Sequence, residues 1–509
     1  MKLFKKIASF TLVLSLVLVA SLAVSTEAFA KTTTTSTSTP VAIGGVLIQG
    51  ADVVVATSGV TASEDGLFHL VASDPNQTAP VGTDVAQAAA ASGASFTVPL
   101  AKDTANSMLF KKFTVCVMKS GALSPVSNSM YITNPEACAS RAPARMNVGK
   151  KGILPDLAVA VANKNQPAAL GAKQVNLNIR VSQLGRLAGY DYSVRKYNSQ
   201  GMQVNVIILA DNTSPSQYVN PYALDQFGAH NYYGLNASTT EGVQALEYAA
   251  SYLAKHYSGI GYGQVDNFII GNEVNAWWLW NYMNCGSNDV FMQEYARAFR
   301  IMYNGIKSEN ATANVYTCID HQWAKAEASY YISGKEFLTK LNTLMTEEGN
   351  VDWRVAAHPY NAPLTSPNAW ETSKNVSHSQ STPYVTMANL DVLTDFLCQT
   401  SMLSPTGAVR TVKVSEVGYT SLLGEQYQAA SIVYANLVAE NNSHVDGLVI
   451  SRETDDAGEI GQGLAYGLCN VDGTQKMAYS FFQNPLDASV IAQASAAAGV
   501  DLTTLITPR

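Results

Sequence analysis

The sequence predicts an α/β protein in which a (β/α)8 TIM barrel is preceded by a small all-β sandwich domain. From about residue 148 onward, short apolar runs alternate with helix-length amphipathic segments, which is the rhythm of βα units around a parallel sheet. Before about residue 140, the apolar runs are short and separated by Gly, Asp, Asn and Pro, which is typical of antiparallel strands. The 509 residues also exceed one average domain, so a large barrel with a small companion accounts for the length.

Residues 41–139 form the predicted sandwich domain. Its apolar runs are ADVVVAT, LFHLVAS, SFTVPL, FTVCVM and SMYIT, and turn residues interrupt them at short intervals. One interpretation of this domain is a carbohydrate-binding module, and the other is a structural domain that packs on the barrel. Few aromatic residues fall at predicted exposed positions, so the structural role is the favoured interpretation.

The predicted barrel domain spans residues 148–485, and residues 486–509 are predicted to form a C-terminal tail. Eight strands are expected, the first of them in the weak segment near Lys151. The expected strands are 151–154, 174–181, 203–209, 266–271, 314–319, 353–357, 411–415 and 445–450. The expected helices are 156–170, 192–199, 240–257, 289–308, 334–347, 387–403 and 426–440.

The first 40 residues carry an export pattern. Three lysines precede the apolar run 7–24, and the AFA sequence at 28–30 provides the small-x-small pattern that a signal peptidase recognises. Residues 1–30 are therefore predicted to be a signal peptide and the Ser/Thr-rich residues 31–40 a linker, so that the mature chain begins near Lys31. The expected location is secreted, extracellular or cell-envelope associated. A single membrane anchor is the alternative, because the apolar run is long.

The composition limits the partners of the protein. A formal net charge of −7 argues against nucleic acid or an anionic membrane surface, and a neutral poly- or oligosaccharide is compatible with it. Hydrophobic residues make up 47% of the chain, which is enough for a large core. No apolar run after the predicted signal peptide is long enough to span a bilayer.

The cysteines and motifs argue against several other kinds of site. Cysteine positions include no CxxC pair, so no metal site is predicted, and no cofactor is expected. The pairs closest in sequence, Cys116 with Cys138 and Cys285 with Cys318, are able to form disulfides in an oxidising compartment, and buried free thiols are the alternative. The chain also lacks the GxSxG, HExxH and P-loop motifs of other enzyme classes.

Two predicted strands end in a glutamate. The stretch VDNFIIGNEVNAWWLW places Glu273 just after an apolar strand, and TVKVSEVGYT places Glu416 at the end of a later one. Alone, either acid has the alternative role of a helix cap or an ion-pair partner. Because the carboxyl ends of barrel strands meet at one mouth, we expect both side chains to face the same cleft. Paired carboxylates about 5 Å apart are what cleavage of a glycosidic bond with retention requires.

These segments resemble the clan A glycoside hydrolases, which are (β/α)8 barrels with the acid/base after strand four and the nucleophile after strand seven. The segments DNFIIGNEVN, YTCIDHQW, VAAHPY and VSEVGY, with an amino-terminal region ending YITNPEA, are also similar to a domain-of-unknown-function family of secreted bacterial proteins related to that clan. The resemblance implies that Glu273 is the acid/base, Glu416 the nucleophile and Asn272 a ligand of the sugar's 2-hydroxyl. Clan A enzymes often have a tryptophan at the end of strand eight, where this chain has SRETDD.

Other predicted strand ends supply candidates for binding a sugar. Sugar hydroxyls need planar hydrogen-bonding groups, and the C–H faces of a sugar need aromatic rings. His358 and Tyr360 either position Glu416 or hold a hydroxyl, and a core histidine is the alternative for His358. Tryptophans in these loops either stack on sugar or anchor the loop. The predicted substrate-binding residues are Asn272, Asn178, Arg180, Trp277, Trp278, Asp320, His321, Trp323, His358 and Tyr360.

The predicted function is therefore a secreted glycoside hydrolase that cleaves a poly- or oligosaccharide by a retaining double displacement, with Glu273 and Glu416 as the catalytic residues. A catalytically inactive carbohydrate-binding barrel and a transglycosylase that uses the same residues are the alternatives. The presence of both glutamates favours activity over binding alone.

Overall fold

The computed structural model describes residues 38–156 and 166–509. The predicted signal peptide, most of the predicted linker and residues 157–165 of the first predicted helix lie outside the described residues. Residues 39–509 form one compact unit. Within the described part of the chain, no helix is both long enough and apolar enough to cross a membrane.

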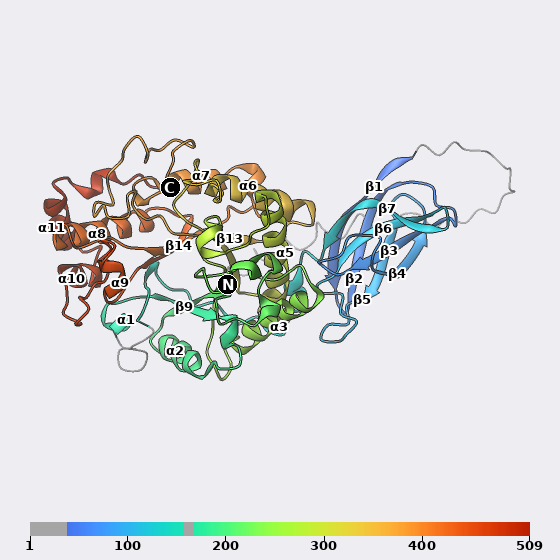
Figure 1. Ribbon diagram of the computed structural model, residues 1–509, viewed down its shortest axis with the longest axis horizontal. Helices are drawn as coiled ribbons and strands as arrows, with labels where there is room; N and C mark the ends of the chain where they lie inside the picture. The colour runs from blue at the N-terminus through green and yellow to red at the C-terminus, as the bar shows by residue number, and fades with distance from the viewer. Residues whose placement is uncertain (1–37, 157–165) are drawn as a thin grey trace, which may run out of the picture. The chain divides into compact units, whose positions relative to one another are not determined.

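Eight parallel strands close into a barrel in chain order, which confirms the predicted fold class (Figure 1). The weak segment at Lys151 is the first strand, and it closes the ring because it pairs with the second strand on one side and the eighth on the other. The strands are β8 (Lys151–Ile153), β9 (Gln174–Arg180), β10 (Gln203–Leu209), β11 (Asn267–Ile270), β12 (Asn314–Ile319), β13 (Trp353–Ala357), β14 (Val412–Val417) and β15 (Val445–Ile450).

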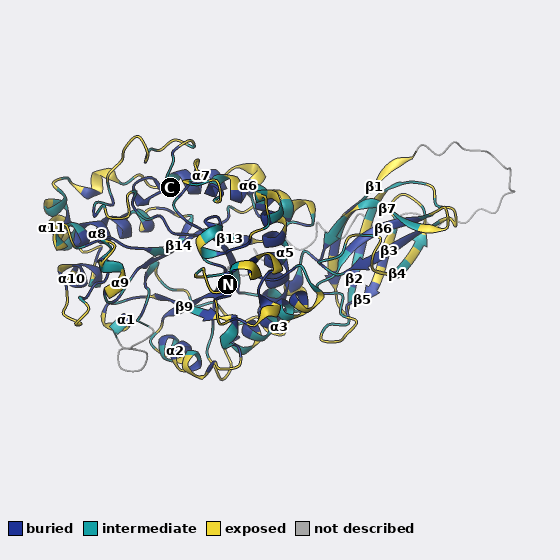
Figure 2. Ribbon diagram, in the orientation of Figure 1, coloured by how far each residue is buried: buried dark blue, intermediate teal, exposed yellow. Residues whose placement is uncertain are grey.

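Helices connect the strands and cover the outside of the barrel, and some of them, such as residues 288–309 and 425–440, are buried along most of their length (Figure 2). Thr239, Ser287 and Ser333 cap the helices α3, α5 and α6, where each side chain accepts a hydrogen bond from a backbone N–H of the first turn. The helices are α1 (Gln166–Ala169), α2 (Ala188–Ser199), α3 (Thr240–His256), α4 (Trp277–Trp280), α5 (Asn288–Glu309), α6 (Gly334–Glu347), α7 (Asp391–Leu397), α8 (Glu425–Glu440), α9 (Ala457–Ile460), α10 (Met477–Gln483) and α11 (Ala488–Ala498).

Two segments differ from the sequence prediction. Residues 387–403, predicted as one helix, form the short helix α7 between 3-10 turns at 387–389 and 400–402. The helix is interrupted because Thr386 and Asn389 form a capping box before it, and Gln399 has extended backbone angles after it. The predicted C-terminal tail contains helix α11, which packs on α8.

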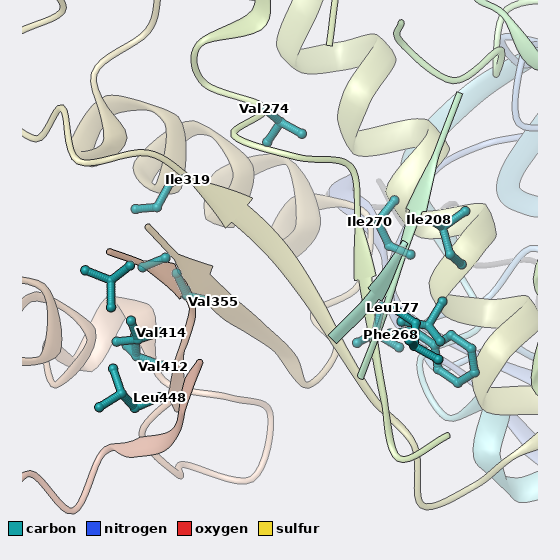
Figure 3. Close-up of a cluster of buried hydrophobic side chains, with 14 of the residues drawn as sticks. Leu177, Ile208, Phe268, Ile270, Val274, Ile319, Val355, Val412, Val414 and Leu448 are labelled. Carbon is teal, nitrogen blue, oxygen red and sulfur yellow. The ribbon is translucent and has the colours of Figure 1, made fainter. Parts of the chain in front are cut away.

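Alternate residues of the barrel strands face the surrounding helices and form the main core. Leu177, Phe268 and Val412 are among these fully buried side chains (Figure 3). Ile269 and Ala356 belong to a second buried cluster, which is made of the residues that face the barrel interior. Because successive side chains of a strand point to opposite faces, a strand buried on both faces needs apolar residues at nearly every position.

Amides fill part of the barrel interior. The side chain of Asn267 donates to Asn205 at 2.6 Å, and Asn205 donates to Asn176 at 2.8 Å, so three neighbouring strands are linked. Asn176 donates in turn to the backbone carbonyl of Ser415 at 2.5 Å. Buried amides need such partners, and this chain of hydrogen bonds fixes the strand β14 that carries one of the two glutamates.

The amino-terminal domain is a pair of antiparallel sheets, with strand orders β1-β2-β5 and β4-β3-β6-β7, around a separate apolar core. Strand β1 begins at Thr39, inside the predicted linker, because Thr39 lies opposite Val60 of β2. All six cysteines of the chain are free thiols, so neither of the two pairs closest in sequence forms a disulfide. The strands are β1 (Thr39–Gln49), β2 (Asp52–Val60), β3 (Leu67–Ser73), β4 (Thr83–Ala89), β5 (Ser95–Pro99), β6 (Lys112–Lys119) and β7 (Ala122–Tyr131).

Candidate active site

Glu273 lies in a tight turn directly after β11. Gly271 has a φ of 84° and Glu273 a φ of 40°, and this left-handed region costs a non-glycine residue about 1–3 kcal/mol. The backbone N–H of Glu273 donates to Cys318 Sγ at 3.4 Å, and its carbonyl accepts from the N–H of Ala276 at 2.8 Å. These contacts hold the turn against β12, and the Glu273 side chain is 14% exposed.

Glu416 lies at an irregularity in β14. Between Val414 and Val417 the register against β15 shifts, so that β14 carries one residue more than its partner over this stretch. Such a β-bulge re-aims side chains, whereas in a regular strand Ser415 and Glu416 would point to opposite faces. The carboxyl of Glu416 accepts a hydrogen bond of 2.6 Å from the hydroxyl of Tyr360.

His358 and Tyr360, which follow β13, each hold one of the two glutamates. Nδ1 of His358 lies 2.8 Å from Oε1 of Glu273, and the Tyr360 hydroxyl donates to Oε1 of Glu416. The centroids of the two rings are 6.4 Å apart. Nε2 of His358 lies 3.0 Å from Oγ of Ser415. One short segment therefore contacts both carboxyl groups at the C-terminal end of the barrel strands, where barrel enzymes carry their chemistry.

The two carboxylates act electrostatically on the same pair of rings. Burial lowers the pKa of His358, but Cys318, Glu273 and Glu416 raise it, so that this pKa lies well above its ordinary value. Burial raises the pKa of Tyr360 well above its ordinary value, and the charges of Glu416 and Glu273 raise it further. Tyr360 therefore stays protonated at neutral pH and keeps its hydrogen bond to Glu416.

Three polar residues predicted to bind a sugar lie near these acids. Asn272 precedes Glu273 and is half-buried. Oδ1 of Asn178 is buried without a hydrogen-bond partner among the described residues. Buried polar atoms ordinarily have partners, so this oxygen is an exception in the described part of the chain. Arg180 pairs with Asp211 at 3.0 Å and keeps 47% of its side chain exposed at the end of β9.

The prediction that Trp323 binds sugar is wrong. This side chain is 1% exposed and packs edge-on against Phe396 of α7, so that no face is open to a ligand. Trp277 is partly buried and stacks on Phe291 of α5, with the ring centroids 5.8 Å apart. Trp278 lies in an aromatic cluster, within 5.3 Å of Tyr330 by ring centroids. Trp277 and Trp278 thus anchor the loop after β11 by packing.

Asp320 and His321 brace the loops around the glutamates. Asp320 is buried and accepts hydrogen bonds from the side chains of Asn275 and Gln322, both at 2.6 Å. Burial raises the pKa of Asp320 to about 6, and the charge of Glu273 adds to the effect. His321 lies with Nδ1 3.0 Å from the backbone carbonyl of Tyr360. Asp320 therefore supports the segment that follows Glu273, and His321 supports the segment that holds Glu416.

The acids after β15 are paired with basic side chains. Asp455 forms a buried pair with Lys476 at 2.7 Å, and Glu459 pairs with Arg452 at 3.0 Å. No group of three or more His, Cys, Asp or Glu side chains in the described ranges is arranged to hold a metal ion.

The comparisons with known proteins identify a family. A model of a family of unknown function, DUF5722, matches residues 185–502. The chain belongs to this family. Both glutamates and the His358–Tyr360 segment lie inside the matched residues, whereas Asn178 and Arg180 lie before them. No curated protein matches the chain.

Solved structures similar to this family member include glycoside hydrolases. One is an uncultured Clostridium sp. β-glucuronidase, with 11% identity over 88% of this chain and 68% of that chain and a TM-score of 0.39. Another is a GH5_18 protein from Streptomyces cattleya in complex with GlcNAc, with 12% identity over 68% of this chain and 80% of that chain and a TM-score of 0.45. A third is the β-glycosidase BGL167, with 12% identity over 64% of this chain and 85% of that chain and a TM-score of 0.41.

Sequence reasoning missed three residues of the site. Tyr466 stacks on Tyr360, with ring centroids 5.6 Å apart and an interplanar angle of 18°. Tyr232 packs against the cluster inside the barrel, and burial and the charge of Glu416 raise its pKa. Cys318 contacts the backbone of Glu273. Tyr466 and Tyr232 lie in long irregular loops, where no periodicity indicates direction, but the inward position of Cys318 on β12 follows from strand alternation.

Proposed function

We propose that this protein is a glycoside hydrolase that cleaves a poly- or oligosaccharide by a retaining double displacement. The single observation that supports it is that His358 and Tyr360, two residues apart, hold the carboxyls of Glu273 and Glu416 at the catalytic end of a closed barrel. Two carboxyls at one barrel mouth are the minimal machinery for this reaction.

In the proposed first step, the carboxylate of Glu416 attacks the anomeric carbon and forms an ester to the sugar, while the bond to the leaving oxygen breaks. Glu273 donates its proton to that oxygen. In the second step, Glu273 takes a proton from water, and the water oxygen attacks the anomeric carbon and releases Glu416. Tyr360 donates to one oxygen of Glu416, so the other oxygen is directed to the sugar.

Substitution of the two glutamates by glutamine tests the proposal. Glu416→Gln keeps the shape of the side chain and loses the attacking charge, so formation of the glycosyl-enzyme should cease while sugar binding survives. Glu273→Gln removes the proton donor, so activated aryl glycosides should still glycosylate Glu416. The stalled intermediate of this variant should be released by azide, which needs no general base, and intact-protein mass spectrometry would detect the adduct.

The same two variants separate an enzyme from a binding protein. A carbohydrate-binding barrel without turnover would show wild-type affinity in both variants and no product from any sugar in a polysaccharide panel. Turnover that is unchanged in both variants would show that these glutamates are not catalytic, and the proposed mechanism would be wrong.

We also propose that the chain is exported and processed near Lys31. The support is the lysine-flanked apolar run followed by AFA at 28–30. Amino-terminal sequencing of protein from the culture medium and from the cell envelope should find a chain beginning near Lys31. Retention of Met1 on membrane-bound protein would contradict export with cleavage.

A further inference from the structure

A guanidinium–carboxylate pair follows β15, the strand next to the one that carries the second glutamate. Ser451 donates its backbone N–H to the carbonyl of Val417, so the residue after Ser451 is next to the strand end that carries Glu416. That residue is Arg452, whose Nη1 lies 3.0 Å from Oε1 of Glu459 and 3.8 Å from Oδ2 of Asp456. The side chains of Arg452 and Glu459 are 27% and 38% exposed, so the pair borders open space.

The pair is close to Glu416 by two independent observations. A Cβ on Gly418 would come within 2.4 Å of the carbonyl of Ser451 and 2.8 Å of the ring of Tyr466, so the ends of β14 and β15 are in contact. Tyr466, whose ring lies against Gly418, also stacks on Tyr360, the phenol that donates to Glu416. Burial raises the pKa of Glu459, Arg452 lowers it, and the charges of Asp456 and then Glu416 raise it. A ligand bound at Glu416 therefore occupies the same barrel mouth as this pair.

The pair also has unused hydrogen-bonding capacity. Arg452 contacts Glu459 and Asp456 through its Nη1 alone. Glu459 contacts Arg452 through its Oε1 alone. A guanidinium has five N–H donors and a carboxylate about four acceptor sites, so among the described residues both groups keep donors and acceptors without a partner. Adjacent hydroxyls of a sugar match this arrangement, because each hydroxyl both donates and accepts.

The local charge balance favours a neutral ligand. Glu459, Asp456 and Asp156 are three carboxylates whose charges raise the pKa of Arg452, so carboxylates outnumber the guanidinium around this pair. A carboxylate on the sugar would be repelled by these protein carboxylates, because charges are weakly screened at this partly buried position.

We propose that Arg452 and Glu459 determine substrate specificity: they hydrogen-bond hydroxyls of the sugar bound over Glu416 and exclude sugars that carry a carboxylate. This inference rests on the proposed glycosidase site. It makes the substrate a neutral glycoside and predicts that Glu459, by neutralising Arg452, is the residue that disfavours uronic acids.

The test compares neutral and anionic substrates in the full chain. The kcat/KM values of 4-nitrophenyl hexosides and of the corresponding hexuronides would be measured for the wild type, Glu459→Gln, Arg452→Met and the control Glu440→Gln. Glu440 is an exposed acid at the C-terminal end of α8, at the opposite end of the barrel from Glu416. Dissociation constants of neutral and uronic-acid oligosaccharides would be measured in parallel by calorimetry, so that the comparison does not depend on turnover.

Wild-type protein should prefer the neutral sugars. Glu459→Gln should lower kcat/KM for hexosides and raise the hexuronide-to-hexoside ratio by about tenfold or more, because the charge of Arg452 is then free to pair with a sugar carboxylate. Arg452→Met should lower kcat/KM for hexosides without raising it for hexuronides, and Glu440→Gln should leave the hexuronide-to-hexoside ratio unchanged.

Two outcomes would overturn this inference alone. In the first, the protein turns over or binds neutral sugars, but Glu459→Gln does not change the hexuronide-to-hexoside ratio. In the second, the wild type prefers hexuronides. Absence of both turnover and binding across the panel would overturn the proposed function with it.

Discussion

Tyr360 controls the orientation of the proposed nucleophile. Its hydroxyl donates to Glu416 at 2.6 Å, and its ring is held between His358 and Tyr466. Because burial and the nearby carboxylates raise its pKa, the phenol remains a donor across the neutral pH range. The hydrogen bond therefore fixes Glu416 without competing for its proton.

Tyr360→Phe removes this donor and keeps the ring. A hydrogen bond to a charged group contributes about 1.5–3 kcal/mol, so the rate of glycosylation should fall about 10- to 100-fold. Pre-steady-state kinetics with an activated aryl glycoside would measure this rate directly. Tyr248→Phe, at an exposed position on α3, is the matched control and should match the wild type. A glycosylation rate equal to the wild type in Tyr360→Phe would show that the hydrogen bond does not position Glu416.

At the scale of elements, strand β14 shows what the alternation of side chains along a strand predicts correctly and what it does not. The run of apolar residues predicted the strand and its terminal glutamate, and the barrel confirms the strand. Strict alternation, however, places Ser415 and Glu416 on opposite faces. The bulge between Val414 and Val417 changes this, and it depends on the pairing with β15, which a single sequence does not contain.

Loop residues were the least predictable part of the site. Trp323 and Trp278 both lie in segments that follow a barrel strand, yet Trp323 is fully buried against α7, whereas Trp278 is in the short helix α4 and keeps a partly exposed ring. Hydrophobic periodicity gives direction inside helices and strands, but loops have no period. Their side chains are placed by tertiary packing, so His358, which directly follows β13, and Tyr232, which lies in a long loop, differ in how well sequence alone locates them.

Strand β3 of the sandwich contains a pH-sensitive element. His69 is 4% exposed, with Nδ1 2.7 Å from Asp84 and Nε2 2.8 Å from Asp65. Burial lowers the pKa of His69, but the hydrogen bonds to Asp84 and Asp65 raise it above its ordinary value. The pKa of His69 is therefore higher in the folded protein than in the unfolded chain. The protonated His69 stabilises the fold fully below about pH 6.5, and this stabilisation is lost as the pH rises through the folded-state pKa.

His69→Gln should therefore destabilise the sandwich more at pH 6 than at pH 9. Hydrogen–deuterium exchange of peptides covering β3 and β6 would measure the protection of this region at both values, after correction for the intrinsic exchange rate. His378→Gln, which removes an exposed histidine paired with Asp391 in the barrel, is the control and should leave β3 unaffected. An effect of His69→Gln that is equal at both pH values would show that its charge does not contribute.

At the scale of the whole molecule, the sandwich and the barrel share a buried ion pair. Lys102, in the loop after β5, pairs with Glu309 at the end of α5 at 3.0 Å, and their side chains are only 14% and 2% exposed. Lys102 also donates to the backbone carbonyl of Ser308 at 2.7 Å, and Glu309 accepts from Ser140 at 2.6 Å. Removing one charge of a buried pair leaves the other charge uncompensated, which is more costly than replacing both.

Lys102→Met should destabilise the barrel although Lys102 belongs to the sandwich. Breaking a buried pair costs about 3–5 kcal/mol, and the double variant with Glu309→Leu should recover part of that loss because no unpaired charge remains. Urea unfolding followed by tryptophan fluorescence reports on the barrel alone, since all six tryptophans lie between residues 277 and 370. If the two domains unfold together, Lys102→Met should move the unfolding transition of the barrel to a lower urea concentration. A double-mutant cycle on Lys102 and Glu309 should give a coupling energy well above that of an exposed pair, which is about 0–1 kcal/mol. A barrel transition that stays at the wild-type midpoint in Lys102→Met would mean that the sandwich unfolds independently and that this pair stabilises only the contact between the domains.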